Sequence, residues 1–265
     1  MKIGIIGCTG RMGRAILEEI LVNSNCEISG GAVRFSSEFV GMDIGTLVGG
    51  QSIGINATGS LEALFSQSDA VIDFSNPATS LQAAKIAAEQ KKIHVIGTTG
   101  FSPEEMAALR NFANDTVIVW SANMSIGVNI LLAITEQVAS ILDDTYDIEI
   151  LEMHHCHKMD APSGTALALG NSAASGRKVS LENVAKRSRD GITGARPRGE
   201  IGFATLRGGD VVGDHTVIFA GDFERIELTH KASNRKIFAR GAVKAALWGK
   251  DKNMGLYSMK DVLMG

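Results

Sequence analysis

The chain has 265 residues and a formal net charge of −3; 45% of the residues are hydrophobic and 21% are charged. This balance excludes wholesale disorder, and the small net charge gives no electrostatic footprint for nucleic acid. No apolar run approaches the ~20 residues of a membrane helix, so no membrane association is expected. Cys8, Cys26 and Cys156 form no Cys-x-x-Cys pair. Their spacing favours a reducing compartment, and a cytoplasmic protein is predicted.

In the first half, short apolar runs alternate with helical patterns. Strands are predicted at 3–6, 27–33, 70–74, 93–96 and 116–120, and helices at 14–21, 79–89 and 104–114. Four apolar residues form the expected inner face of the first helix: Ile16, Leu17, Ile20 and Leu21. Ser102 is the expected cap of the last helix, with proline after it. This alternation predicts an α/β fold with a Rossmann-like, doubly wound parallel sheet.

Past about residue 125 the pattern changes. Helices are expected at 129–142 and 240–248, and strands at 147–153, 201–206, 210–220 and 225–230. Gly208-Gly209-Asp210 has the composition of a hairpin turn between two of these strands. We therefore expect a second, α+β domain with a mixed or antiparallel sheet.

A glycine-rich stretch follows the first predicted strand and opens the first helix: Gly7-Cys8-Thr9-Gly10-Arg11-Met12-Gly13-Arg14. This context is that of a dinucleotide fingerprint, although the first two glycines are one residue further apart than usual. Backbone N–H groups at the helix start would receive the pyrophosphate. A plain strand-to-helix turn is the alternative, and the flanking strand and helix favour the nucleotide interpretation.

Arg34 lies about 20 residues beyond the last glycine of the motif, at the position that reads the ribose in such folds. An acidic residue there would bind the ribose of NAD, whereas a guanidinium suits a 2′-phosphate. A solvated surface arginine is an equally good interpretation. Two loops that follow predicted strands, Gly97-Thr98-Thr99-Gly100 and Ser121-Ala122-Asn123-Met124-Ser125, would line the same crevice, or they are simple turns.

Residues with side chains suited to acid–base or metal chemistry are most concentrated between Glu152 and Ala166, where half of the six histidines fall within four residues. A zinc site is one interpretation. However, His154 and His155 point to opposite faces of a strand and no second cluster completes the ligands, so no metal is expected. His154 and Lys158, four residues apart beside a turn that could bind an anion, suggest acid–base work on an anionic substrate. Solvated or structurally bonded histidines remain the alternative.

That turn is Pro162-Ser163-Gly164-Thr165. Ser163 can cap the helix that starts there, and the N–H groups of Gly164 and Thr165 would then face an anion. An ordinary helix cap is the alternative. The histidines and the lysine upstream favour a carboxylate site.

The stretch 152–166 closely resembles the signature of the 4-hydroxy-tetrahydrodipicolinate (dihydrodipicolinate) reductase family of lysine and diaminopimelate biosynthesis. The resemblance extends nearly end to end, from the glycine motif through Asp73-Phe74-Ser75, Val212 to Thr216, Thr229 to Ser233 and Gly241 to Trp248. It implies an NAD(P)H-dependent reductase of a cyclic dicarboxylate, usually a homotetramer. It also implies a dinucleotide-binding domain at 1–125 with 236–265, and a substrate-binding and oligomerisation domain at 126–235.

The resemblance also assigns residues by position. His154 matches a proton donor or acceptor and Lys158 a proton donor, while His155, Gly164 and Thr165 match contacts to the substrate. The expected cofactor contacts are Gly7, Cys8, Thr9, Gly10, Arg11, Met12, Gly97, Thr98, Thr99, Ser121, Ala122, Asn123 and Met124. Many members carry an acidic residue in place of Arg34 and a basic one in place of Phe35. The family's usual cofactor preference therefore does not carry over to this chain. Because a planar guanidinium pairs bidentately with phosphate, Arg34 leads us to expect that NADPH serves at least as well as NADH.

Two other classes of function compete with this interpretation. One is a regulatory sensor that binds nucleotide without turnover, against which the clustered proton donors argue. The other is a metallohydrolase built on the histidine cluster.

Overall fold

The computed structural model describes all of residues 1–265 and divides into two compact units. The first comprises Met1–Ile126 and Arg235–Gly265, and the second Gly127–Asn234. The split falls beside the boundaries expected at 125 and 236. No helix is both long enough and apolar enough to cross a membrane.

The first unit is a parallel seven-stranded sheet in the order β12-β6-β5-β4-β1-β2-β3. Its strands are β1 (Lys2–Ile6), β2 (Glu27–Ala32), β3 (Ala57–Thr58), β4 (Ala70–Asp73), β5 (Ile93–Ile96), β6 (Val117–Trp120) and β12 (Gly255–Tyr257). Its helices are α1 (Arg11–Leu21), α2 (Ile44–Leu47), α3 (Leu61–Ser66), α4 (Pro77–Gln90), α5 (Pro103–Phe112), α9 (Lys236–Gly249) and α10 (Met259–Met264). The predicted doubly wound parallel sheet is confirmed.

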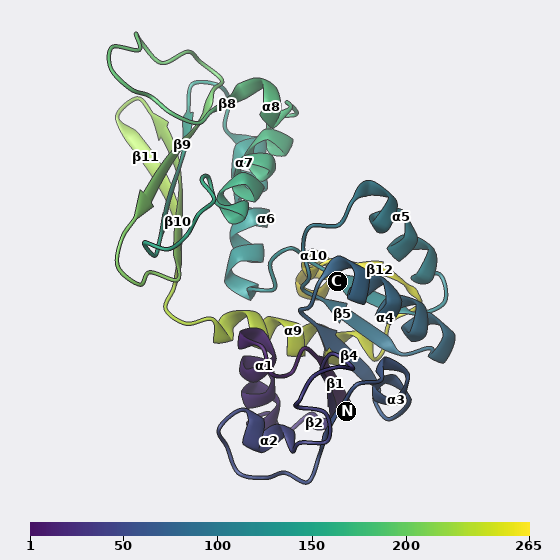
Figure 1. Ribbon diagram of the computed structural model, residues 1–265. Coiled ribbons are helices and arrows are strands. Elements are labelled where there is room, and N and C mark those ends of the chain that lie inside the picture. The colour runs from purple at the N-terminus through teal and green to yellow at the C-terminus, as the bar shows by residue number, and fades with distance from the viewer. The chain divides into compact units, whose positions relative to one another are not determined.

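Helices cover both faces of this sheet, as Figure 1 shows for α1 and α9 on one side and α3, α4 and α5 on the other. The alternation of strand side chains explains both layers. Ile3 and Ile5 of β1 pack in one apolar cluster with α1 and α9, while Ile6 packs in another with α3 and α4. The predicted cap of α5 at Ser102 is confirmed, and it forms a reciprocal capping box with Glu105.

The second unit is a five-stranded mixed sheet in the order β11-β10-β7-β9-β8. Its strands are β7 (Asp147–His154), β8 (Ala185–Lys186), β9 (Ile201–Arg207), β10 (Gly213–Gly221) and β11 (Glu224–Ala232). Its helices are α6 (Ile126–Ile141), α7 (Gly164–Gly176) and α8 (Leu181–Val184), and α6 and α7 lie along the same side of the sheet (Figure 1). A single core joins Ile148 and Ile150 of β7 to Leu169 of α7 and Phe219 of β10. The predicted mixed α+β unit is confirmed.

The hairpin predicted at Gly208-Gly209-Asp210 is wrong. Strand β9 pairs in parallel with β7, and β10 pairs antiparallel with the other edge of β7, so β7 lies between them. The glycine turn instead crosses the end of β7: Gly208 donates its N–H to the His154 carbonyl at 3.0 Å, and His155 donates to the Val211 carbonyl at 2.8 Å. The hairpin is formed by β10 and β11. The composition of a turn predicts that the chain reverses there, but it does not predict which strand the following strand pairs with.

Leu21 was expected on the inner face of α1, and this is also wrong. Its side chain is 55% exposed, whereas Ile16, Leu17 and Ile20 are at most 1% exposed. At 100° per residue, Leu21 lies about a quarter-turn from the centre of the face that these three define.

This difference yields a matched test of the α1 packing. Replacing Leu17 by Ala should lower the free energy of unfolding by about 2–5 kcal/mol, because a buried side chain leaves a cavity. Replacing Leu21 by Ala should change it by about 0.5 kcal/mol or less, the usual scale for surface substitutions. Urea denaturation measures both, and equal losses would contradict the orientation of the helix.

Candidate active site

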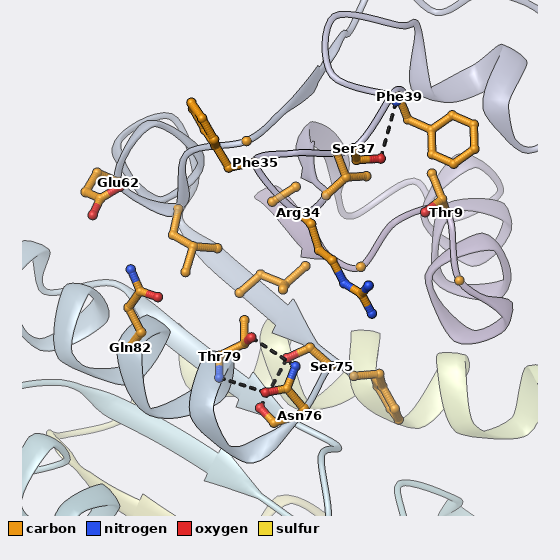
Figure 2. Close-up of a pocket in the computed structure, with 18 residues that line it drawn as sticks. Thr9, Arg34, Phe35, Ser37, Phe39, Glu62, Ser75, Asn76, Thr79 and Gln82 are labelled. Atoms are coloured by element: carbon orange, nitrogen blue, oxygen red, sulfur yellow. Dashed lines mark hydrogen bonds between the residues drawn. The ribbon is translucent and has the colours of Figure 1, made fainter.

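A cavity of about 670 Å³ opens where the direction of strand order reverses, at β1 and its neighbours β2 and β4. In open α/β sheets, ligands bind outside the carboxyl ends of strands at this switch point. Figure 2 shows its lining residues, which come from the ends of β1 and β2, from the segments that follow β1, β2, β3 and β4, and from α3 and α4. They include Gly7, Thr9, Gly10, Arg34 and Asn76. Four predicted cofactor residues are thus brought together by the fold.

The glycine motif builds one wall of this cavity. Gly7 has φ +74°, which glycine adopts readily and other residues do not. At Gly13 an added Cβ would overlap the Gly7 carbonyl and the Cys8 backbone, so only glycine lets α1 approach β1 this closely. Gly10 is the N-cap of α1, with no side chain bonded to the first turn. The start of the helix therefore offers its N–H groups to an anion.

Arg34 reaches into the cavity from the turn after β2, and Figure 2 shows its side chain directed into the space that the lining residues enclose. The guanidinium makes no hydrogen bond or ion pair in the structure. Phe35 beside it is 89% exposed. Further lining residues not predicted from the sequence are Ser37, Phe39, Glu62, Thr79 and Gln82, because they come from a loop and from two helices that carry no nucleotide-specific pattern.

The remaining predicted cofactor residues do not line this cavity. Cys8 and Met124 are each 1% exposed and pack in the core. Thr98 is held inside the unit, where its hydroxyl accepts from the Ser75 N–H and contacts the Ser80 hydroxyl, both at 3.0 Å. The others that lie outside the lining are Arg11, Met12, Gly97, Thr99, Ser121, Ala122 and Asn123. The loops after β5 and β6 begin at the carboxyl edge of the sheet, where the cavity also lies. Their contact with the cofactor stays a prediction.

The second group of predicted residues lies at the end of β7. Buried and partly exposed residues alternate along this strand, so Glu152 and His154 share the buried face with Ile148 and Ile150. The Nδ1 atom of His154 lies 2.5 Å from Oε2 of Glu152. His154 is 8% exposed and Glu152 is 1% exposed. His155 lies just beyond the end of the strand and is partly exposed.

Glu152 had no role predicted from the sequence, yet it is the most connected group of this site. Arg207 donates to both of its carboxylate oxygens, at 2.9 and 3.0 Å, and the Ser163 N–H donates to Oε1 at 3.0 Å. Burial raises the pKa of this carboxyl, but the bonds from Arg207, His154 and Ser163 outweigh it and lower the pKa below its ordinary value. Glu152 is therefore ionised at neutral pH. Its position two residues before His154, on a strand, was the available signal.

Lys158 lies on the turn that follows β7, where its Nζ donates to Asp160 Oδ1 at 2.8 Å. This bond is the main cause of a lowered pKa at the Asp160 carboxyl. The side chain of Lys158 is 20% exposed and that of Asp160 is 61% exposed. An ammonium whose counter-ion is this exposed can exchange it for a carboxylate of a ligand.

The predicted carboxylate turn forms the start of α7. Ser163 is its N-cap, and the hydroxyl accepts from the Ala166 N–H at 3.1 Å. A Cβ added to Gly164 would meet nothing within 4 Å, so the first turn of the helix opens on free space. The helix is 13 residues long, and its dipole favours an anion at this end. Thr165 follows Gly164 in the same first turn.

His215 of β10 contacts both His154 and Ser163, the N-cap of α7. Its Nε2 lies 3.1 Å from the Ser163 hydroxyl, and its ring packs edge-on against that of His154 with centroids 5.0 Å apart. Burial lowers the pKa of His215 to about 4, and the neighbouring His154 adds to this shift. His215 is therefore neutral at physiological pH. No group of three or more His, Cys, Asp or Glu residues is arranged to hold a metal ion.

The low pKa of His215 predicts a loss of stability in mild acid. The unfolded chain takes up a proton below about pH 6.5 while the folded chain does so only near 4, so stability falls as the pH drops through this window. At pH 5 the loss amounts to about 2 kcal/mol. Glu152, whose pKa lies below its ordinary value of 4.5, adds its own loss only at lower pH.

Urea denaturation at pH 7.5 and pH 5 tests this expectation. The variant His215→Gln keeps a hydrogen-bonding group toward Ser163 but cannot titrate, so it should lose less stability than the unchanged chain over this interval. Equal losses in the two proteins would contradict a neutral, buried His215.

Comparisons with known proteins place the chain in a family. Residues 1–124 match the family model "Dihydrodipicolinate reductase, N-terminus" and residues 127–263 match "Dihydrodipicolinate reductase, C-terminus". The chain is 53% identical to the 4-hydroxy-tetrahydrodipicolinate reductase of Parvibaculum lavamentivorans, with 99% of this chain and 97% of that protein covered. It is 51% identical to the one of Dinoroseobacter shibae, covering 98% and 97%.

Solved structures agree in fold. A dipicolinate-bound dihydrodipicolinate reductase from Paenisporosarcina sp. TG-14 has a TM-score of 0.82 at 22% identity, with 99% of each chain covered. An amine dehydrogenase from Mycobacterium smegmatis has a TM-score of 0.60 at 12% identity, covering 97% of this chain and 95% of that one. The resemblance seen in the sequence is confirmed by the two family matches and the relatives. The chain belongs to the dihydrodipicolinate reductase family of NAD(P)H-dependent oxidoreductases.

Proposed function

We propose that this chain reduces 4-hydroxy-tetrahydrodipicolinate to tetrahydrodipicolinate with NAD(P)H, a step of lysine and diaminopimelate biosynthesis. One observation of the structure carries the proposal: an acid–base histidine, a lysine and an open helix start gather at one end of the second unit's sheet. Together they match the needs of an anionic substrate that must receive a proton. The names carried by relatives that are half identical along the whole chain support it.

The residues of the first unit fit a dinucleotide. Gly7, Thr9 and Gly10 would hold the pyrophosphate against the start of α1, and Arg34 would meet the 2′-phosphate of NADPH as a planar, bidentate partner. The bound cofactor supplies the hydride, while the protein supplies orientation and charge. The proposal therefore includes that NADPH serves at least as well as NADH.

The residues of the second unit fit a dicarboxylate. The N–H groups at Gly164 and Thr165 would receive one carboxylate at the start of α7, and Lys158 would pair with the substrate's negative charge in place of Asp160. His155 and Ser163 complete the predicted substrate contacts. Dipicolinate, a flat pyridine dicarboxylate, is bound to the Paenisporosarcina relative named above, which supports this class of ligand.

Hydride addition to a conjugated, imine-like ring leaves negative charge that must be protonated. We assign Lys158 to proton donation and charge pairing, and His154 to proton relay, because an imidazole ring can both accept and donate a proton. The homotetramer and the cytoplasmic location stay predictions.

Absorbance at 340 nm with freshly generated 4-hydroxy-tetrahydrodipicolinate tests the proposed function. Oxidation of NADPH that depends on this substrate is expected. Nucleotide binding without oxidation would favour the regulatory sensor, and turnover of an unrelated substrate that a chelator abolishes would favour a metallohydrolase.

Replacing Arg34 by Ala should lower kcat/KM for NADPH about tenfold and leave NADH nearly unchanged, since tenfold corresponds to the loss of one charge-assisted bond. Fluorescence titration should show the same selective loss in the Kd of NADPH. Arg110→Ala, at the exposed end of α5, is the matched control. An unchanged Kd for NADPH would show that Arg34 does not bind the phosphate.

Gly164→Leu should raise KM for the substrate about tenfold or more, because its side chain fills the space where the carboxylate must reach the helix start. The open surroundings of Gly164 should let the variant fold, which circular dichroism checks. Dipicolinate should inhibit it more weakly, while the Kd of NADPH stays the same. Equal loss of substrate and NADPH affinity would indicate a shared defect instead.

His154→Ala and Lys158→Ala should each lower kcat by about 100-fold or more, the usual scale for a general acid or base. Lys158→Ala should also raise KM, whereas His154→Ala should act mainly on kcat. The double variant should lose less than the product of the two, because both groups serve one proton transfer. Near-normal kcat in a folded Lys158→Ala enzyme would refute this assignment.

A further inference from the structure

We propose that Glu152 is the positioning residue of the reaction: its carboxylate fixes the proton on Nδ1 of His154 and presents Nε2 to the substrate, while the same carboxylate holds the carboxylate-binding turn of α7 in place. The inference rests on the proposed function, in which His154 transfers a proton.

The hydrogen bonds of Glu152 show that it acts only through other groups. Oε2 accepts from His154 at 2.5 Å and from Arg207 at 2.9 Å, and Oε1 accepts from Ser163 and Arg207, both at 3.0 Å. Four bonds fill the acceptor capacity of a carboxylate. At 1% exposure it has no free face for a substrate. Glu152 therefore cannot itself exchange a proton with a ligand.

An ionised carboxylate can only accept hydrogen bonds, which settles the state of the imidazole. Nδ1 of His154 must carry the proton that it shares with Oε2, so in the neutral ring Nε2 has the lone pair. Nε2 makes no hydrogen bond within the chain. It is thus the atom available to take a proton and return it.

The packing around the imidazole keeps it in this orientation. The His215 ring lies edge-on against it, and a Cβ at Gly213 would lie 2.9 Å from Nε2. Turning the ring over would take Nδ1 away from Glu152 and leave a buried carboxylate oxygen with one donor fewer. The tautomer and the orientation are therefore set by the same contact.

The ion pair with Arg207 makes the buried Glu152 carboxylate compatible with a site for anionic substrates. The bidentate pairing neutralises Glu152, so the carboxylate orients His154 without repelling the dicarboxylate. Arg207 also donates to the Asp160 carbonyl at 2.6 Å, which joins it to the turn that bears Lys158. Through the Ser163 N–H, Glu152 further fixes the residue that caps α7. One carboxylate thus sets the proton carrier and the anion-binding turn relative to each other.

The test uses the full-length enzyme with freshly generated 4-hydroxy-tetrahydrodipicolinate and NADPH. Glu152→Gln keeps the size of the side chain but can donate as well as accept, so the tautomer is no longer fixed. We expect kcat to fall about 100-fold or more, KM to change less than about threefold and the Kd of NADPH to stay the same. Glu152→Asp keeps the charge and should restore part of kcat.

Two further variants keep the test decisive. Glu152→Gln/Arg207→Met removes both charges and leaves no unpaired arginine, and it should show the same loss of kcat. Glu149→Gln removes a carboxylate from the opposite face of β7, where it pairs with Arg189 and Arg196, and kcat should stay within about twofold, as expected for a distant surface site.

An unchanged kcat in a folded Glu152→Gln enzyme, or in the double variant, would overturn the positioning role while the proposed function stands. A parallel loss of kcat, substrate affinity and NADPH affinity would also overturn it, since that pattern indicates general disruption. Absence of turnover in the unchanged enzyme would overturn the proposed function and, with it, the reaction in which Glu152 acts.

Discussion

A carboxylate that is 1% exposed at the end of β7 constrains the whole second unit. An isolated buried charge costs several kcal/mol, so Glu152 is compatible with folding only because Arg207, His154 and Ser163 all reach it. These partners come from three places: Arg207 ends β9, His154 ends β7 and Ser163 precedes α7. The mixed pairing of the sheet, with β9 parallel to β7, places Arg207 opposite His154, and from there its side chain reaches Glu152. The residues that stabilise this one buried charge are therefore also the residues that form the candidate site.

The first unit depends on a different constraint, the reversal of strand order at β1. This reversal leaves the turns after β1, β2 and β4 around an open space, and the tight approach of Gly13 to Gly7 places the start of α1 beside it. The cavity of the first unit is thus shaped mainly by backbone geometry, while the group at the end of β7 is held together mainly by side chains. This division explains why glycine dominates one motif, and histidine, lysine and glutamate the other.

Local patterns predicted the elements that have strong periodicity or clear caps. Five strands of the first unit (β1, β2, β4, β5 and β6), the cap at Ser102 and the cap at Ser163 follow from residues close together in the chain. Short elements such as β3 and α3, and the C-terminal β12, were missed because two to six residues carry no period. The order of strands in the second sheet could not be predicted, since the turn at Gly208 does not reveal that β7 separates β9 from β10.

The candidate site shows the same limit. His154, Lys158 and the turn at Gly164 are contiguous in sequence and were found together. Arg207 and His215 lie about fifty residues away, so their contact with this segment depends on strand pairing alone. Glu152 lies within the segment, but its role appears only once Arg207 and Ser163 are placed around it. Arg34, which was considered for a cofactor contact because of its distance from the glycine motif, lines the cavity.

The most direct measurement of the central claim is nitrogen-15 NMR of the histidine side chains in the unchanged enzyme, with His154 assigned by comparison with His154→Ala. At a pH where the ring is neutral, the account predicts that Nδ1 of His154 carries the proton and that Nε2 is unprotonated. A neutral His154 with its proton on Nε2, or one that exchanges freely between both forms, would contradict the claim that Glu152 sets the state of this residue.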